Sequence, residues 1–79
     1  MDRKELEAKI ISFFATTYDQ EASALSMDTK IKEELSSSSM LMVSLVSTIE
    51  NEIDVMIPLP DAGKFKTIGD VVDMVEGQL

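Results

Sequence analysis

The stretch that decides the fold is Glu33–Ile53, which reads EELSSSSMLMVSLVSTIENEI. It begins with two glutamates and a run of serines, and it continues into the most regular apolar pattern of the chain. The apolar positions fall at i, i+3, i+4, i+7 and i+11, which places them on one face of an α-helix: Met42, Leu45, Val46, Ile49 and Ile53. The pattern therefore predicts a helix over about residues 39–53, with this face against a core.

The serine run Ser36–Ser39 lies where this helix starts. A serine side chain at a helix start accepts a hydrogen bond from a free backbone N–H group. The same N–H groups, together with the helix dipole, favour a bound phosphate. Spacing alone leaves two interpretations open: the serines only cap and turn the chain, or one of them carries a phosphate-linked group.

The N-terminal part predicts a helix over about residues 3–16. Asp2, with Glu5 three residues later, has the pattern of a capping box. The residues that follow keep helical spacing: Leu6, Ile10, Phe13 and Phe14. Residues 16–19 read TTYD and are unfavourable for continuing the helix.

Residues 18–38 form a long connection. Loops of this length are uncommon in compact domains unless they are functional or hold structure of their own. Leu25 and Met27 are therefore expected to contact the core. Ile31 and Leu35, four residues apart, predict a helical turn before the serines.

The segment Ile57–Pro60 ends the helical pattern, because its two prolines and the residues before them resist α geometry. Residues 61–64 leave room only for a short helical turn. A last helix is predicted from Thr67, which has Asp70 three residues later as in a capping box. Its expected buried face consists of Ile68, Val71, Val72 and Val75. Gly77 fits its C-terminal end, and no segment predicts a strand.

The chain has 79 residues, of which fifteen are acidic and seven basic, for a net charge of −8. This length predicts one domain, residues 1–79. Nucleic acids and anionic membranes attract clusters of Lys and Arg, so the charge argues against both and favours basic partners. The segment 33–63 contains no Lys or Arg, and it is either an anionic docking surface or an ordinary solvated face.

The sequence offers little to an enzyme. It contains neither Cys nor His, so thiolate metal sites and the commonest acid–base group are missing. No spacing matches a nucleophilic triad or a glycine-rich phosphate loop. A protein that binds or carries is favoured over one that catalyses. No signal peptide or membrane-spanning segment is recognisable, which predicts a cytoplasmic protein, with a processed organellar protein as the alternative.

The sequence resembles the acyl carrier proteins, most clearly over residues 31–75. Glu34–Met40 is similar to the family's lead-in to its second helix, without a gap, and Ser39 matches the serine that receives 4′-phosphopantetheine. Residues 43–53 resemble the body of that helix and its acidic end. Further positions fall in the family's register after it: Ile57, Pro58, Ala62, Lys64, Thr67, Ile68 and Asp73.

The resemblance implies an all-α fold, a small four-helix bundle with a short third helix and a long loop between the first and second helices. It implies a carrier that holds acyl groups as thioesters on a 4′-phosphopantetheine arm at Ser39, in a specialised fatty acid, lipid or secondary-metabolite pathway. The implied partners are a phosphopantetheinyl transferase and acyl-transferring or condensing enzymes with basic or apolar docking patches. The carrier itself is expected to be a monomer. Met40 and Met42 beside the attachment point supply adaptable apolar surface or fill the core.

The chain departs from the family's pattern around the attachment serine. The family has Asp before that serine and Leu after it, where this chain has Ser38 and Met40, and Leu41 and Ser44 stand where many members carry acidic residues. This uncharged helix start predicts a dedicated partner, with Met40, Leu41 and Ser44 as docking residues together with Glu50 from the acidic end of the helix. The alternative is a helical interaction module without a cofactor, in which the serines form a linker, a cap or a phosphorylation target.

Overall fold

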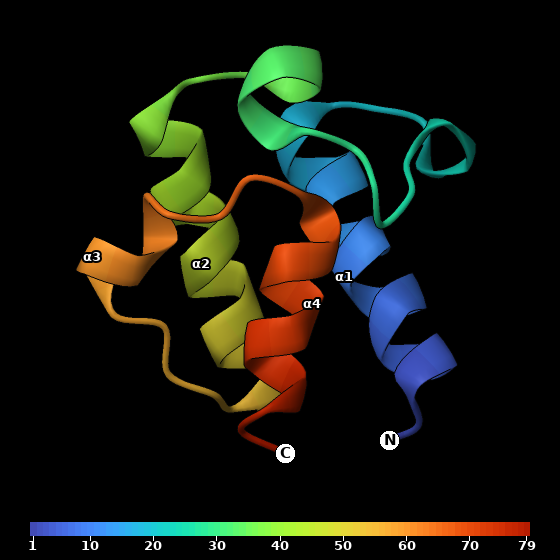
Figure 1. Cartoon of the computed structure of the whole chain (residues 1–79), viewed down its shortest axis with the longest axis vertical. Coiled ribbons are helices and arrows are strands. Elements are labelled where there is room, and N and C mark those ends of the chain that lie inside the picture. The colour runs from blue at the N-terminus through green and yellow to red at the C-terminus, as the bar shows by residue number, and fades with distance from the viewer.

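The computed structural model describes residues 1–79 and contains helices and loops but no strand. The chain forms four α-helices (Figure 1): α1 (Arg3–Tyr18), α2 (Ser39–Ile53), α3 (Leu59–Ala62) and α4 (Ile68–Glu76). The connection between α1 and α2 contains a 3₁₀ turn, η1 (Ala22–Ala24), and a π-helical turn, η2 (Ile31–Leu35). The predicted all-α bundle, with a short third helix and a long connection after the first, is confirmed.

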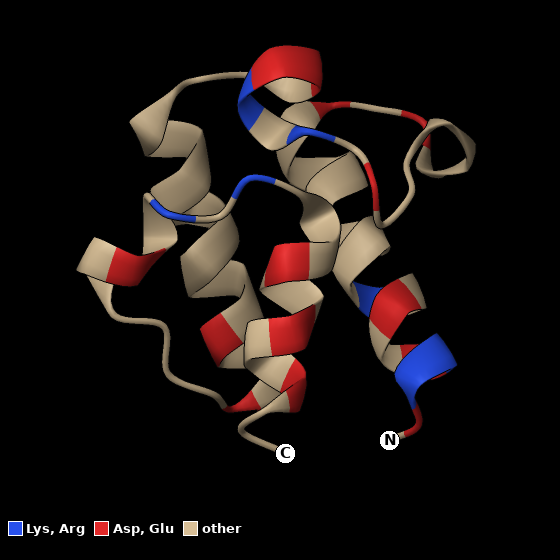
Figure 2. Ribbon diagram, in the orientation of Figure 1, with Lys and Arg blue, Asp and Glu red and all other residues tan.

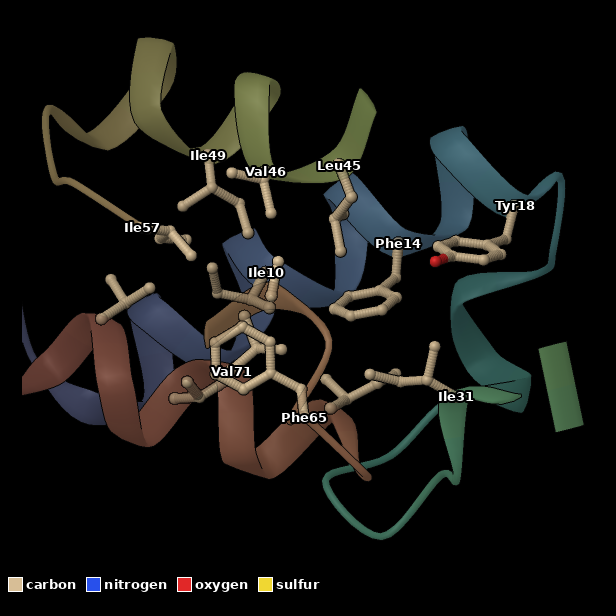
Figure 3. Close-up of a cluster of buried hydrophobic side chains, with 14 of the residues drawn as sticks. Ile10, Phe14, Tyr18, Ile31, Leu45, Val46, Ile49, Ile57, Phe65 and Val71 are labelled. Carbon is tan, nitrogen blue, oxygen red and sulfur yellow. The ribbon is translucent and has the colours of Figure 1, made fainter. Parts of the chain in front are cut away.

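The core lies where α1 packs against both α2 and α4, while the short α3 lies beside α2 (Figure 1). It contains 16 buried apolar residues, drawn from all four helices and from the connections. Phe14 lies among these side chains, with its ring between Leu45 of α2 and Phe65 (Figure 3). On the predicted face of α2 the central residues Leu45, Val46 and Ile49 are buried. The residues at its two ends, Met42 and Ile53, are partly buried.

The first helix is longer than its sequence predicts, since α1 continues through the two threonines to Tyr18. Tyr18 lies one turn after Phe14, and the two rings stack with their centroids 5.6 Å apart. Burial of this aromatic pair outweighs the low helix propensity of the threonines. The helix ends at Asp19, whose φ of 54° is left-handed, a conformation that Asp tolerates better than most residues.

Side-chain caps start three of the helices. The Asp2 carboxylate accepts from the Glu5 N–H at 2.8 Å, although Glu5 does not complete a capping box. The box predicted at α4 is complete: Thr67 Oγ1 accepts from the Asp70 N–H at 3.2 Å, and Asp70 accepts from the Thr67 N–H at 3.1 Å. These backbone N–H groups of Thr67 and Lys66 lower the pKa of Asp70.

Two predicted boundaries differ in detail. The third helix begins at Leu59 and includes Pro60, whereas a turn over 61–64 was predicted. Proline is tolerated there because the first turn of a helix needs no N–H donor. Gly77 does end α4, but with a right-handed φ of −62°, so the end does not depend on the conformational freedom of glycine.

The long connection is fastened to the start of α4 by backbone pairing. Ile31 N–H donates to the Lys66 carbonyl at 2.9 Å, and Ile68 N–H donates to the Thr29 carbonyl at 3.1 Å. This gives one antiparallel bridge, between Lys30 and Thr67. Leu25 and Ile31 are buried, which confirms that the connection contributes to the core. None of the helices is long and apolar enough to cross a membrane.

Candidate functional site

Ser39 is the first residue of α2 and its side chain is exposed. The cap is the preceding residue, Ser38, whose hydroxyl accepts from the Leu41 N–H at 3.3 Å. Ser36 holds Ser38 in turn, since its hydroxyl accepts from the Ser38 N–H at 3.1 Å. The two structural serines thus leave the Ser39 hydroxyl without a hydrogen-bond partner and available for chemistry.

A cavity of about 220 Å³ opens beside Ser39. The serine run lines one part of it, and the other lining residues come from the end of α1, η2, α2 and α3: they include Tyr18, Ile31, Met42, Val43, Leu59 and Ala62. The site therefore combines a free hydroxyl with a mainly apolar cavity next to it.

Tyr18 lines this cavity and carries an unusual buried polar group. Its side chain is 7% exposed, and its hydroxyl is buried without a hydrogen-bond partner. Figure 3 shows the oxygen pointing from the end of α1 towards the interior, in the direction of Phe14. Burial raises the pKa of Tyr18, because an apolar surrounding disfavours the phenolate.

The predicted docking residues of α2 lie in different surroundings. Met40 is 82% exposed and Ser44 is exposed, and these positions share a face of the helix with the exposed Val43. Leu41 is partly buried and packs against the core. The structure thus brings Met40, Val43 and Ser44 together beside Ser39, while Leu41 faces partly inward.

Glu50 lies two turns further along α2 and has a structural contact. Its carboxylate accepts from the Ile57 N–H at 2.8 Å. This hydrogen bond holds the turn after α2, immediately before Pro58, in place. The carboxylate is only partly buried, so its role in docking stays a prediction.

Sequence reasoning missed three residues of the site. Tyr18 lay outside the predicted first helix, Val43 lay outside the apolar stripe of α2, and Leu59 lay in a proline-rich segment. Val43 and Leu59 are 47% and 67% exposed and line the cavity. For Val43 a signal was available in the sequence, because it is an apolar residue outside the predicted buried face of α2 and close to the serine run.

The chemistry open to this site is attachment and shelter. No group of three or more potential metal ligands occurs in the chain. A free serine hydroxyl at the start of a helix of 15 residues can carry a phosphate ester, because the helix dipole and first-turn N–H groups favour an anion. No acidic residue lies in the first turn of α2 to oppose it.

Comparisons with known proteins agree with this geometry. No family model matches the chain. An acyl carrier protein of Porphyromonas gingivalis is 31% identical over 75 residues, covering 95% of this chain and 96% of the relative. One from Rickettsia canadensis is 31% identical over 72 residues, covering 91% of this chain and 84% of the relative. One from Borrelia garinii subsp. bavariensis is 29% identical over 76 residues. With such relatives along nearly its whole length, the chain belongs to the acyl carrier protein family.

Proposed function

We propose that this protein carries acyl groups as thioesters on a 4′-phosphopantetheine arm attached to Ser39. The observation that carries the proposal is the free, exposed Ser39 hydroxyl at the start of α2, beside an apolar cavity. Membership in the acyl carrier family supports a carrier role. The proposed role of the protein is to position and shield the cargo, while separate enzymes make and break bonds.

The residues present fit the proposed cofactor. Ser39 supplies the hydroxyl for a phosphodiester, and Ser38 caps α2 without involving that hydroxyl. The arm supplies the thiol that this cysteine-free chain lacks. An absence of cysteine also removes any internal thiol that could exchange with a thioester.

The cavity supplies a shelter for the proposed cargo. Its walls include Val43, Leu59 and Ala62, and burying apolar cargo against them is favourable by about 25 cal/mol per Å² of surface removed from water. Met42 lies in the same wall, and a methionine side chain adapts to a changing shape more easily than a branched one.

The proposed partners are a phosphopantetheinyl transferase and acyl-transferring or condensing enzymes. Met40 offers an exposed apolar anchor beside Ser39, which suits an apolar patch on such an enzyme. The acidic end of α2, with Glu52 and Asp54, suits a basic one. We place the protein in the cytoplasm as a monomeric single domain, without catalysis of its own, in a specialised fatty acid, lipid or secondary-metabolite pathway.

Intact mass spectrometry tests the proposal. The wild-type protein, incubated with coenzyme A and a phosphopantetheinyl transferase, should gain the mass of one phosphopantetheine. Ser39→Ala should gain none, and Ser37→Ala, an exposed serine of the same run, should load like the wild type. Loading of Ser39→Ala would move the attachment site to another serine. Protein from its native host that carries a phosphate or no group would instead support a cofactor-free interaction module.

A further inference from the structure

A second hollow, larger than the cavity at Ser39, lies between η2 and the segment that leads into α4. It is an open groove of about 800 Å³ lined by four lysines, Lys30, Lys32, Lys64 and Lys66, with Phe65 as its one apolar lining residue. These are four of the seven basic residues of a chain whose net charge is −8. Figure 2 shows the two basic segments next to each other.

Backbone pairing creates this cluster from two distant parts of the sequence. The hydrogen bonds of Ile31 to Lys66 and of Ile68 to Thr29 place residues 29–31 antiparallel to residues 66–68. Each segment carries two lysines two positions apart, Lys30 and Lys32 in one and Lys64 and Lys66 in the other, and Lys30 itself forms the bridge with Thr67. Because the two segments are held side by side, their four lysines line one groove and their positive charges act together.

Positive charge exceeds negative charge in the groove, since four of its eight lining residues are lysines and one, Glu33, is acidic. Lys30 and Lys64 make only long contacts of 3.8 Å, to Glu33 and Asp61 respectively, and both contacts are exposed. The side chains of Lys32 and Lys66 make no ion pair, although the backbone N–H of Lys66 donates to the Asp70 carboxylate at 3.0 Å. Exposed pairs of this kind contribute little and exchange readily for other partners, so the groove presents cations that are free to bind an external anion.

The groove adjoins the proposed attachment site. Lys32 and Gly63 line both the groove and the cavity at Ser39. An enzyme that reaches Ser39 or cargo in the cavity must therefore approach within the field of the lysines.

We propose that the groove binds an acidic segment of the partner enzymes, beside their contact with the start of α2. This inference rests on the proposed carrier function. In this contact the carrier supplies the positive charge and the partner the negative charge. The contact proposed for the acidic end of α2 has the opposite arrangement, with the negative charge on the carrier.

The exposure of the lysines favours an extended acidic segment over a small anion such as a free phosphate. All four lysines are exposed to solvent. A site that holds one small anion tightly needs convergent donors removed from water. An acidic segment can instead contact several lysines while one of its apolar side chains contacts the small exposed part of Phe65, a core residue that lines the groove and is 8% exposed.

The test is an NMR titration of the unmodified protein with a short peptide rich in Glu and containing Leu. The same peptide with Gln in place of Glu serves as the uncharged control. Amide shifts should move at residues 30–32 and 64–67 with the acidic peptide only, and the affinity should fall with added salt. Lys32→Glu with Lys66→Glu should weaken binding by about tenfold, because two attractions become repulsions.

A matched variant separates a local site from net charge. Lys4→Glu with Lys9→Glu makes the same charge change on exposed residues of α1 and should weaken binding by less than about threefold. Circular dichroism should show both variants folded, and Lys32→Gln with Lys66→Gln should bind with intermediate affinity. Equal weakening by both Glu variants, or absence of binding by the wild type, would overturn the proposal.

A further titration with small anions tests the alternative that the groove is a small-anion site. Coenzyme A or pyrophosphate that binds the groove more tightly than the acidic peptide would also overturn the proposal, in favour of a small-anion site. Because the titration uses protein without a cofactor, its result is independent of Ser39 loading. Peptide binding by a protein that never loads would refute the carrier function alone, and loading without peptide binding would refute the groove alone.

Discussion

Tyr18 combines a favourable aromatic contact with an unsatisfied hydroxyl. Its ring stacks on Phe14, and its hydroxyl is buried without a partner. An unsatisfied buried polar group costs about 1–3 kcal/mol. Tyr18→Phe keeps the ring and removes the hydroxyl, so we expect the free energy of unfolding in urea to rise by about 1 kcal/mol. A loss of that size would instead show that the hydroxyl has a hydrogen-bond partner in solution.

The same residue predicts a pH dependence. Burial raises the pKa of Tyr18 in the folded protein, so the unfolded chain releases this proton first as the pH rises through about 10. Above that pH the unfolded state binds fewer protons and stability falls. Tyr18→Phe should lose less stability than the wild type between neutral and alkaline pH in thermal melts.

Ile49 lies at the centre of the buried face of α2 with no exposed surface. Ile49→Ala should lower the free energy of unfolding by about 2–4 kcal/mol, because a cavity replaces the lost side chain. Val43→Ala on the same helix is the matched control, since Val43 is 47% exposed, and its effect should stay below about 0.5 kcal/mol. Equal losses from the two variants in urea unfolding would contradict the assignment of the buried face.

The uncharged start of α2 predicts slow loading by a general phosphopantetheinyl transferase. Ser38→Asp restores the acidic residue of the family pattern and keeps a good cap, and Ser44→Asp adds a charge at an exposed site. The partly buried Leu41 is less suitable, because a carboxylate there would disturb the core. The double variant should load several-fold faster than the wild type.

The control for this prediction carries the same added charge elsewhere. Ser12→Asp with Ser23→Asp places it on exposed residues of α1 and η1. Equal loading rates for the wild type and both variants, all as fast as an ordinary carrier, would show that the altered motif does not specialise this protein.

At the scale of elements, the start of α4 depends on close contact with the long connection. Gly69 N–H donates to the Met27 carbonyl at 2.9 Å. A Cβ at Gly69 would lie 2.9 Å from that carbonyl oxygen, so an alanine must push the backbone of the connection away. Alanine favours a helix over glycine by about 1 kcal/mol, but we expect the clash to win. Gly69→Ala should lower the free energy of unfolding by about 1–2 kcal/mol.

Gly63 provides the comparison within the same chain. Its Cβ would meet no atom within 4 Å, and its φ is −80°. Gly63→Ala should therefore keep or slightly raise stability. If both glycine variants behave alike in urea unfolding, the contact between Met27 and α4 is not what requires glycine at position 69.

At the scale of the whole molecule, negative charge accumulates near the ends of α2, with Glu50, Glu52 and Asp54, and of α4, with Asp73 and Glu76. α1, α2 and α4 have no basic residue in their last turns, where cations would complement the helix dipole. Arg3 offsets part of this charge, with contacts of 2.9 Å to Asp73 and 3.0 Å to Glu76. The remaining repulsion is exposed and is open to screening by salt.

Added salt should therefore stabilise the fold. Raising the ionic strength from about 0.01 M to about 0.15 M shortens the screening length from about 30 Å to about 8 Å. The Tm measured by circular dichroism should rise with both sodium chloride and potassium chloride. Sulfate salts are avoided because they strengthen apolar burial by themselves. A Tm that falls with salt would mean that the Arg3 ion pairs outweigh the repulsion.

The sequence by itself determined the number and approximate places of the helices, the main caps and the place of Ser39 at the start of α2. Helical spacing within α2 predicts its buried face, because neighbouring turns of one helix meet the core together. The caps at Asp2, Ser38 and Thr67 act within three residues of themselves. Local interactions of this kind can be read without knowledge of distant segments. Tyr18 marks the limit, because its packing extends α1 beyond the point that propensity indicates.

Only the tertiary structure decided which distant residues meet. The cavity at Ser39 needs the end of α1, η2 and α3 around the start of α2. The lysine groove needs residues 29–31 to pair with residues 66–68. In the sequence these lysines are two unremarkable pairs in an acidic chain. The four lysines form one positively charged surface because backbone hydrogen bonds hold the two segments side by side. No local sequence pattern encodes that pairing.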